Sequence, residues 1–343
     1  MPETTPSTEN RITRASDWMP VLARYREPGL GRSLFELAVT FIPFVLLWAM
    51  AVWSLQVGYW LTLLVALPTA GFLVRLFIIQ HDCGHGAYFR QKWLNGWVGR
   101  CIGVLTATPY FVWHRAHAQH HAAAGNLDNR GIGAVHTLTV EEYQAKSWSG
   151  RLSYRVFRSP LVLFGIGPAY VFLLQNRLPL EFLNGGWRYW VSAMGTNLMM
   201  LLVASGVIWL IGWQAFLAVF LPVMLFAASI GVWLFYVQHQ FEDTHWSRHE
   251  DWQIHHAALH GSSHYDLPQP LQWITGNIGI HHVHHLNARI PFYRLPKVLK
   301  DHPALASIKR LTLWQSLKSI NLHLWCETRQ RLVSFREAKL AAA

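Results

Sequence analysis

The chain has 343 residues, of which 52% are hydrophobic, 14% are aromatic and only 14% are charged. This composition excludes an ordinary soluble protein and indicates an integral membrane protein. A formal net charge of +11 is common in nucleic-acid-binding proteins, but the basic residues are not interleaved with a recognisable nucleic-acid-binding module, so we expect no nucleic-acid partner.

The first hydrophobic segments predict a transmembrane hairpin. Residues 1–16 are polar without an apolar core, so we expect no cleavable secretory signal there, whereas segments 37–55 and 60–80 are each long enough to cross a hydrocarbon core of ~30 Å. Their connection is uncharged, and five arginines precede them, so the amino terminus is expected in the cytoplasm: Arg11, Arg14, Arg24, Arg26 and Arg32. We expect Arg75, near the end of the second segment, to extend its guanidinium to the same interface.

Two groups of histidines follow this hairpin. His81 and His85 come directly after the second segment, and a shorter apolar stretch, 101–113, precedes the second group: His114, His117, His120 and His121. A stretch of about 13 residues is short for a span and suits an interfacial or re-entrant segment. Both groups are therefore expected on the cytoplasmic side.

A polar loop at 125–150 leads into three further apolar stretches: 160–174, 190–210 and 215–237. If all three crossed the membrane, the later histidines would emerge on the opposite side from the first two groups, and one shared site could not form. The first stretch is the shortest, contains prolines and glycines and is flanked by arginines, so we expect it not to span. The prediction is four transmembrane helices in two hairpins, with both termini and all histidine groups in the cytoplasm.

The last histidines complete a pattern typical of a metal site. His239 follows the final apolar stretch, and a third group lies further on: His281, His282, His284 and His285. Helical residues at i, i+3 and i+4 share a face, so each group can direct imidazoles toward one point. Nine candidate ligands exceed the three or four of one zinc ion, which indicates two metals: His81, His85, His117, His120, His121, His239, His281, His284 and His285. A redox role next to a lipid interior favours iron.

The motifs HxxxH (81–85), HxxHH (117–121) and HxxHH (281–285) resemble the three histidine boxes of the membrane fatty acid desaturases. The segments at 125–143, 238–246 and 276–296 are similar to bacterial acyl-lipid desaturases of the Δ12 (omega-6) type and their Δ5 and Δ9 relatives. The resemblance covers most of residues 75–300. It implies that these nine histidines bind a non-haem di-iron centre, that O₂ is a co-substrate, and that a cis double bond is inserted into an acyl chain.

Some family features are absent or unassigned. Phe235 stands where some acyl-CoA desaturases have a water-linking asparagine, and the division of the ligands between the two irons stays open. Neither a haem-binding His-Pro-Gly-Gly signature nor a GxGxxG nucleotide site is present, so the electrons are expected from an external ferredoxin, flavodoxin or cytochrome b5-like donor. The basic surface would attract an acidic carrier.

Further residues are expected around the ligands, and no catalytic side chain is expected beyond the metal centre. A carboxylate that accepts the free ring N–H of a ligand fixes its orientation, which suits Asp82, Glu242 and Asp243. His114 and His282 are expected around the ligands or at the surface rather than bound to a metal, because nine ligands suffice. The histidines of the polar loop are expected to be solvated: His245, His249, His255, His256, His260 and His264.

We expect one all-α membrane domain over residues 1–343, with interfacial helices and a cytoplasmic cap that carries the di-metal site. Its parts are a polar tail (1–16), the first hairpin (37–80), the first two boxes with interfacial segments (81–189), the second hairpin (190–238), the ninth histidine with the third box (239–296) and a basic amphipathic tail (297–343). Alternating apolar and basic residues around 308–320 predict a helix lying on anionic lipid. Three cysteines without CxxC spacing predict no disulfide: Cys83, Cys101 and Cys326.

Two alternatives to a desaturase remain. A hydroxylase or ketolase would use the same di-iron site, and a non-catalytic membrane metal-binding or transport protein would use the histidines differently. Transport predicts ionisable residues within the spans, and apart from Arg75 the expected spans have none.

Overall fold

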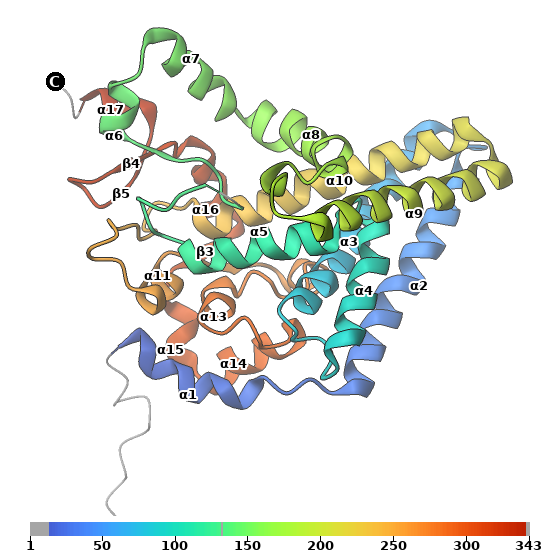
Figure 1. The fold of residues 1–343 in the computed structure, drawn as a ribbon, viewed down its shortest axis with the longest axis horizontal. Helices are drawn as coiled ribbons and strands as arrows, with labels where there is room; N and C mark the ends of the chain where they lie inside the picture. The colour runs from blue at the N-terminus through green and yellow to red at the C-terminus, as the bar shows by residue number, and fades with distance from the viewer. Residues whose placement is uncertain (1–13, 132, 341–343) are drawn as a thin grey trace, which may run out of the picture.

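The structure is a computed structural model in which residues 14–131 and 133–340 are described. Residues 1–13, most of the predicted polar tail, lie outside the described residues. Four described helices are long and apolar enough to cross a membrane: α2 (Leu30–Ser54), α3 (Tyr59–Gly84), α9 (Trp187–Ile211) and α10 (Trp213–His239). Short turns join them into two hairpins, so the predicted set of four spanning helices is confirmed (Figure 1). Gly212 adopts a φ of 82° at the second turn, a conformation that glycine reaches without a Cβ clash.

The four spans differ in how much of their surface the protein itself covers. In α3, 61% of the apolar stretch is buried, because this helix packs against α2 and α10, whereas 0% of the corresponding stretch of α9 is buried. Ala193 is the one buried residue of α9. A helix that is apolar all round and uncovered by protein must face lipid. The central position therefore belongs to α3, and α9 lies at the lipid-facing edge.

Shorter helices connect the hairpins. They are α4 (Lys92–Leu105), α5 (Tyr110–Ala123), α6 (Val140–Gln144), α7 (Trp148–Phe157), the π-helical η4 (Val162–Ile166) and α8 (Gly167–Leu173). The stretch at 160–174, predicted not to span, is divided between η4 and α8, and together with α7 it forms a pair of helices bent by 54°. As one broken span this pair would raise the number of spans to five, which would separate the histidine groups onto opposite faces.

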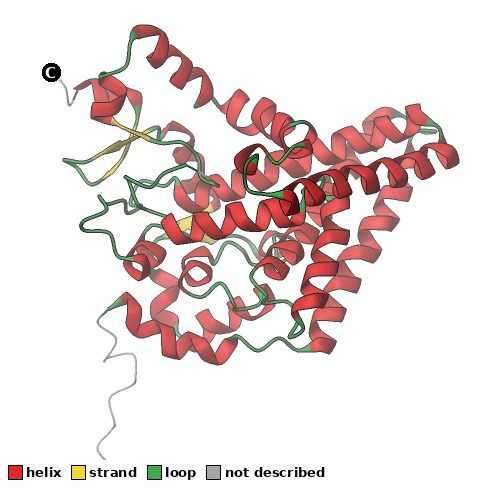
Figure 2. Ribbon diagram, in the orientation of Figure 1, coloured by secondary structure: helices red, strands yellow, loops and turns green. Residues whose placement is uncertain are grey.

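The cap contains short helices and two small sheets (Figure 2). Its helices include α1 (Trp18–Leu22), α11 (Ile254–His260), α12 (Gln269–Ile274), α13 (His281–Leu286), α14 (Leu295–Asp301), α15 (Pro303–Ser307) and α17 (Phe335–Leu340). One sheet has the order β1 (Leu138–Thr139), β4 (Leu324–Cys326) and β5 (Arg331–Val333), with β1 parallel and β5 antiparallel to β4. The other pairs β2 (His264–Asp266) with β3 (Arg310–Thr312) in parallel. The all-α prediction thus holds for the membrane part, while the cap adds strands.

The amphipathic helix predicted around 308–320 is not formed. Residues of this segment instead form β3, which pairs with β2, followed by the short helices α16 (Leu313–Ser316) and η8 (Leu317–Asn321). Thr312 ends the strand and caps α16, since its Oγ1 accepts a hydrogen bond from the Gln315 N–H. Pairing with a strand from a distant segment overrides the helical spacing of the apolar residues. Trp314 remains 77% exposed, so this segment still presents an aromatic ring at the surface.

The sequence predicted that Arg75 reaches the interface, and the structure shows that it does not. Its side chain is 1% exposed, and its Nη2 lies 2.5 Å from Oε2 of Glu36 on α2. The Nε donates to Oγ1 of Thr40 at 3.1 Å, and the guanidinium lies 4.1 Å from the ring centroid of Trp273. The Glu36 carboxylate on the neighbouring helix lies within reach of the guanidinium. Arg75 therefore forms a buried ion pair instead of extending to the interface. The three cysteines are free: Cys83 and Cys326 are buried and Cys101 is exposed.

Candidate metal centre

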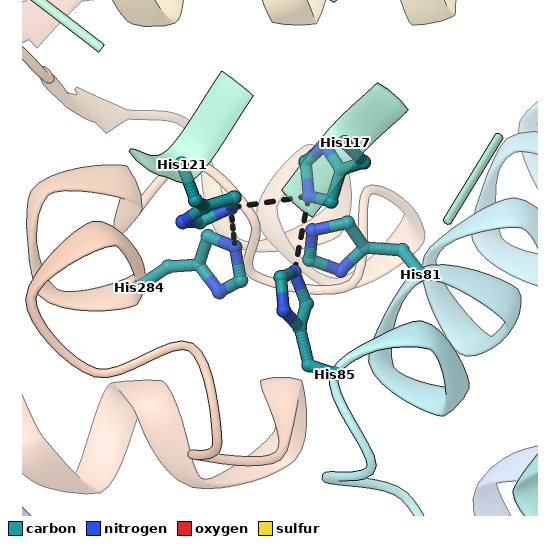
Figure 3. Close-up of side chains that lie close together, drawn as sticks. All are labelled: His81, His85, His117, His121 and His284. Atoms are coloured by element: carbon teal, nitrogen blue, oxygen red, sulfur yellow. Dashed lines mark hydrogen bonds between the residues drawn. The ribbon is translucent and has the colours of Figure 1, made fainter. Parts of the chain in front are cut away.

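The predicted ligand histidines converge where α3 and α10 meet the cap. They form two groups: His81, His85, His117, His121 and His284 in the first, and His120, His239, His281 and His285 in the second. Within each group, one possible ligand atom from every residue lies within 4.8 Å of the others. Figure 3 shows the five rings of the first group pointing toward one another from three elements of the chain. The structure therefore brings all nine together and divides them five to four.

Helical spacing explains how each element contributes. His81 and His85 lie at i and i+4 at the end of α3, and both point to the first group. In α5, His117 and His121 also lie at i and i+4 and face the first group, while His120 turns to the second.

The helix α13 contributes to the two groups in the opposite way to α5. His281 and His285 are its i and i+4 pair and face the second group, while His284 faces the first. Because α5 and α13 each contribute to both groups, the two groups share walls, and the rings of His121 and His285 stack at 4.1 Å between centroids. Two metals held in this way would be neighbours.

The ring nitrogens are placed for a shared cation. The Nε2 of His117 lies 3.0 Å from that of His85, and the Nε2 of His239 lies 3.0 Å from that of His120. An imidazole pair can form one hydrogen bond, so several converging rings cannot satisfy one another. The buried Nε2 atoms of His81 and His285 have no hydrogen-bond partner among the described residues. A set of nitrogen donors with unpaired atoms fits transition-metal ions.

The protonation state of these rings also suits ligation. Burial, reinforced by the neighbouring imidazoles, lowers the pKa of His117, His121 and His284 well below the ordinary value for histidine. The same causes lower the pKa of His285. These rings are therefore neutral at pH 7, which is the form that binds a metal.

Asp82, one of the carboxylates predicted to orient a ligand, contacts His81 through its side chain. Its Oδ1 lies 3.1 Å from Nδ1 of His81, and its Oδ2 accepts the backbone N–H of Phe292 at 2.6 Å. A proton on Nδ1 of His81 leaves Nε2 free for the metal. His239 is oriented similarly, since its Nδ1 lies 3.3 Å from the backbone oxygen of Gly261. The sequence did not reveal this second contact, because a backbone carbonyl carries no residue-specific signal.

The other two carboxylates are not beside the ligands. Glu242 is exposed and forms an ion pair with Arg331, and Asp243 is also exposed. The helix α10 ends at His239, and the chain then turns outward, which directs both side chains to the surface. Their predicted orienting role is therefore wrong in this structure.

The additional histidines lie outside both groups. His282 is buried, and its Nε2 lies 2.9 Å from the backbone oxygen of Leu305. His114 stacks on Tyr110 at 6.1 Å between centroids. His264, expected to be solvated, is only 6% exposed, because it lies in β2 and its Nδ1 contacts the carbonyl of Ala306.

A small cavity borders the second group. Its volume is about 30 Å³, and its lining includes His120, His239, Phe235 and Gln240. A space of this size holds about one water molecule. The ring centroid of Phe235 lies 5.1 Å from that of His120, so an apolar ring faces the second group.

Arg158 is a contributor that the sequence did not single out, since it was one of several arginines flanking an apolar stretch. It is 0% exposed, and its Nη2 donates to Oε1 of Gln240 at 2.9 Å and to the carbonyl of Leu322 at 2.8 Å. Gln240 directly follows the ligand His239. Arg158 therefore ties the end of α10 to the carboxyl-terminal segment.

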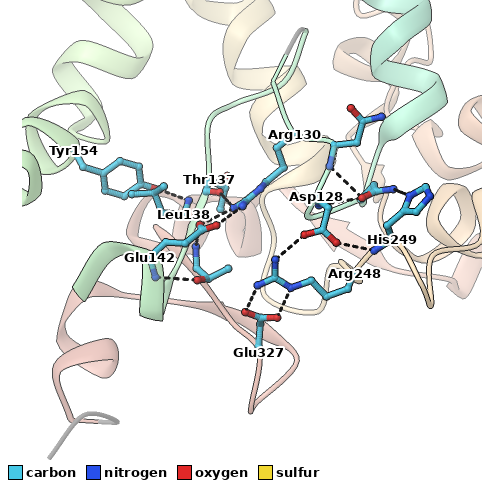
Figure 4. A network of polar contacts seen from close by, with 12 residues as sticks. Asp128, Arg130, Thr137, Leu138, Glu142, Tyr154, Arg248, His249 and Glu327 are labelled. Atoms are coloured by element: carbon cyan, nitrogen blue, oxygen red, sulfur yellow. Dashed lines mark hydrogen bonds and ion pairs between the residues drawn. The ribbon is translucent and has the colours of Figure 1, made fainter. Parts of the chain in front are cut away.

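Ion pairs attach the loop that follows α5 to other segments of the cap (Figure 4). Arg248 contacts Asp128 at 2.7 Å and Glu327 at 2.8 Å, while Arg130 pairs with Glu142. Asp128 also accepts the backbone N–H of His249 at 2.8 Å, so its carboxylate joins two loops. These contacts hold the 125–143 segment beside the end of α5, which carries the second histidine box.

Comparison with known proteins identifies the family. The model of the fatty acid desaturase family matches residues 58–316. The chain belongs to this family. A fatty acid desaturase of Bacillus subtilis (strain 168) is 46% identical over 93% of this chain and 90% of its own length.

More distant relatives carry more specific names. An sn-1 acyl-lipid omega-3 desaturase (ferredoxin) of Synechocystis is 28% identical over 70% of this chain and 68% of its own. An sn-1 oleoyl-lipid 12-desaturase of Picosynechococcus is 27% identical over 76% of this chain and 71% of its own. The protein is thus a membrane enzyme that desaturates fatty acids, and its histidine clusters are the parts of the desaturase that could hold metal ions.

Proposed function

We propose that this desaturase binds two irons, reduces O₂ with two externally supplied electrons, and inserts a cis double bond into an acyl chain of a membrane lipid. The convergence of nine histidines in two adjoining groups carries the proposal. We further propose Δ12 (omega-6-like) regiochemistry, because several similar proteins are named oleoyl-lipid 12-desaturases.

Bound iron would supply the redox chemistry that removes two hydrogen atoms from adjacent methylene groups while O₂ is reduced to water. The chain's own residues prepare the site for it. Asp82 keeps a proton on Nδ1 of His81, so that Nε2 faces the metal, and the Gly261 carbonyl orients His239 in the same way. The buried positions of His120, His281 and His284 keep bulk water out.

The substrate would approach from the membrane. The ligands at the ends of α3 and α10 lie on two helices that span it, so both metal groups adjoin the apolar region where acyl chains reside. Holding two neighbouring carbons against this centre would determine where the double bond forms.

We place the metal centre and both termini in the cytoplasm, at the cell membrane, because arginines cluster before α2 while the hairpin tips are uncharged. The electrons would come from an acidic carrier such as a ferredoxin. Two relatives carry ferredoxin in their names, and the net charge of +11 would attract an acidic protein.

Gas chromatography with mass spectrometry of derivatised fatty acids, after expression in a bacterial host, tests the reaction. We expect a new cis double bond at Δ12 in lipid-bound chains, lost in His239→Ala and retained in His255→Ala, whose ring belongs to neither ligand group. A new hydroxylated acid without a new alkene would establish the hydroxylase alternative. Metal analysis of the purified protein should give about two irons per chain, whereas zinc alone would contradict the cofactor assignment.

A further inference from the structure

A second cluster of imidazoles lies on the cap, outside both ligand groups. His256 and His260 are at i and i+4 on α11, and His245 approaches from the segment after α10. The ring centroids of His245 and His256 are 4.6 Å apart, and those of His256 and His260 are 4.5 Å apart. We call these three residues the α11 cluster. The proposed desaturation makes no use of it.

The metal centre itself provides a standard for these distances. His81 and His85, also at i and i+4, have centroids 4.7 Å apart, and those of His117 and His121 are 4.6 Å apart. The ring spacings of the α11 cluster are therefore similar to those of helical histidine pairs that belong to one ligand group. The sequence spacing HxxxH of His256 and His260 is also that of the two histidines on a zinc-binding helix.

The cluster is accessible and free to rearrange. His256 is exposed, while His245 and His260 are half-buried. A hollow of about 550 Å³ opens beside it, and its lining includes His245, His256 and Asp251. Across residues 14–131 and 133–340, none of the three rings hydrogen-bonds to another residue or forms an ion pair. A metal would therefore displace no existing polar contact.

The rings would have to turn to share one ion. Unlike the two groups of the metal centre, the α11 cluster does not bring one nitrogen of each ring within 4.8 Å of the others. Rotation of partly exposed rings leaves the core unchanged, because a terminal histidine torsion is broad. This rotation is the conformational change that binding requires.

The charged residues around the α11 cluster include some that favour and some that oppose the binding of a cation. The pKa of His260 is lowered to about 4, mainly by burial and further by the neighbouring His256 and Lys309. The same causes lower the pKa of His245. His245 and His260 are therefore neutral at pH 7, which is the form that binds a metal. The Lys309 ammonium would repel a dication. The exposed carboxylate of Asp243 acts on Lys309 and partly offsets its charge.

We propose that His245, His256 and His260 bind one divalent transition-metal ion, with zinc as the best-suited ion and an open coordination position toward the hollow. Three imidazoles and a water complete a tetrahedral zinc site. This site is separate from the catalytic metals and does not depend on the identity of the lipid substrate.

Zinc titration of the purified, iron-loaded enzyme, followed by metal analysis after gel filtration, tests the site. We expect one zinc per chain in addition to the irons. His256→Ala and His260→Ala should each lose this zinc while retaining iron content and fatty acid product, and the adjacent His255→Ala should bind zinc as the unmodified protein does.

A variant of Lys309 tests the effect of the neighbouring positive charge on zinc binding. Lys309→Met should bind zinc several-fold more tightly, because it removes a repulsive charge and leaves the three rings in place. Zinc uptake that is unchanged in His256→Ala, or that displaces an equal amount of iron, would overturn the proposal. Absence of any bound zinc in the iron-loaded enzyme would overturn it as well.

Discussion

Asp82 contacts Nδ1 of His81 and would thereby direct Nε2 of this ring toward a bound metal. One carboxylate oxygen contacts Nδ1 of His81, and the other accepts the N–H of Phe292 at the start of the 3₁₀ turn η7 (Phe292–Arg294). The side chain is 1% exposed, so neither donor has water as an alternative partner. A single buried carboxylate thus links the first histidine box to the segment after the third.

Replacing Asp82 by Asn should weaken metal binding by about 10- to 100-fold. His81 and Phe292 contact different oxygens of the carboxylate, and the amide keeps an oxygen at only one of these two positions. Iron retained per chain after dialysis against a chelator measures the effect, with circular dichroism to verify the fold. Cys83→Ala, a change at the next buried position, should retain iron, and equal retention by both variants would refute the role of Asp82.

His323 should make folding sensitive to acid. Its ring stacks on Phe335 at 4.3 Å between centroids, and burial, aided by Arg158 and Arg155, lowers its pKa from 6.5 to about 4. Between these values the unfolded chain takes up a proton that the folded chain refuses, so stability falls as the pH drops from about 6.5 to about 4.

The variant His323→Phe keeps an aromatic ring against Phe335 and removes the titrating group. Its unfolding midpoint should therefore decline less between pH 6.5 and 4 than that of the unmodified protein. Thermal unfolding in detergent at equal metal loading provides the comparison. Parallel pH profiles for the two proteins would show that His323 is not responsible.

At the scale of elements, α2 and α3 are joined by an ion pair that lies inside the protein. Glu36 is 2% exposed and contacts two arginines, Arg75 on α3 at 2.5 Å and Arg32 one turn earlier at 2.6 Å. Arg75 is buried, whereas Arg32 is 56% exposed. Loss of the partner of a buried charge lowers the free energy of unfolding far more than loss of the partner of an exposed charge.

We expect Glu36→Ala to destabilise the protein by about 3–5 kcal/mol, because it strands the Arg75 guanidinium. Arg32→Ala removes the exposed partner of the same carboxylate and should cost about 0–1 kcal/mol. Apparent unfolding midpoints in detergent distinguish the two variants. Similar midpoints for both would mean that Arg75 finds another counter-charge or is hydrated.

At the scale of the whole molecule, the hairpins make the orientation testable. The uncharged turn between α2 and α3 is expected outside the cell, and the turn between β4 and β5 on the cap is expected inside. Among the described cysteines, Cys101 is exposed and the other two are buried, so Cys101→Ser provides an unreactive background.

In that background, a membrane-impermeant maleimide should label Gln56→Cys in intact cells and Arg329→Cys only in inside-out vesicles. Both positions are exposed. The reverse pattern would place the metal centre outside the cell, and labelling of both from one side would show that the number of crossings is wrong.

Short-range sequence patterns determined the spans and the ligands. Continuous apolar stretches identify α2, α3, α9 and α10 without tertiary information, because a bilayer requires a stretch of about 20 such residues. The spacing of His117, His120 and His121 likewise predicts imidazoles on one side of a helix. The eight histidines selected from the three boxes and His239, selected by its place after the last apolar stretch, all lie in the two groups. The side chains on each face of a helix depend only on residues close together in the sequence, so the sequence alone predicts them.

Only the tertiary structure decided which residues meet. The five-to-four division of the ligands follows from α5 and α13 lying between both groups, which no spacing within one helix specifies. Arg75 finds Glu36 on another helix, β3 pairs with a strand that starts at His264, and Glu242 turns away toward Arg331. These outcomes depend on contacts between segments far apart in the chain, and the geometry of such contacts is settled by packing.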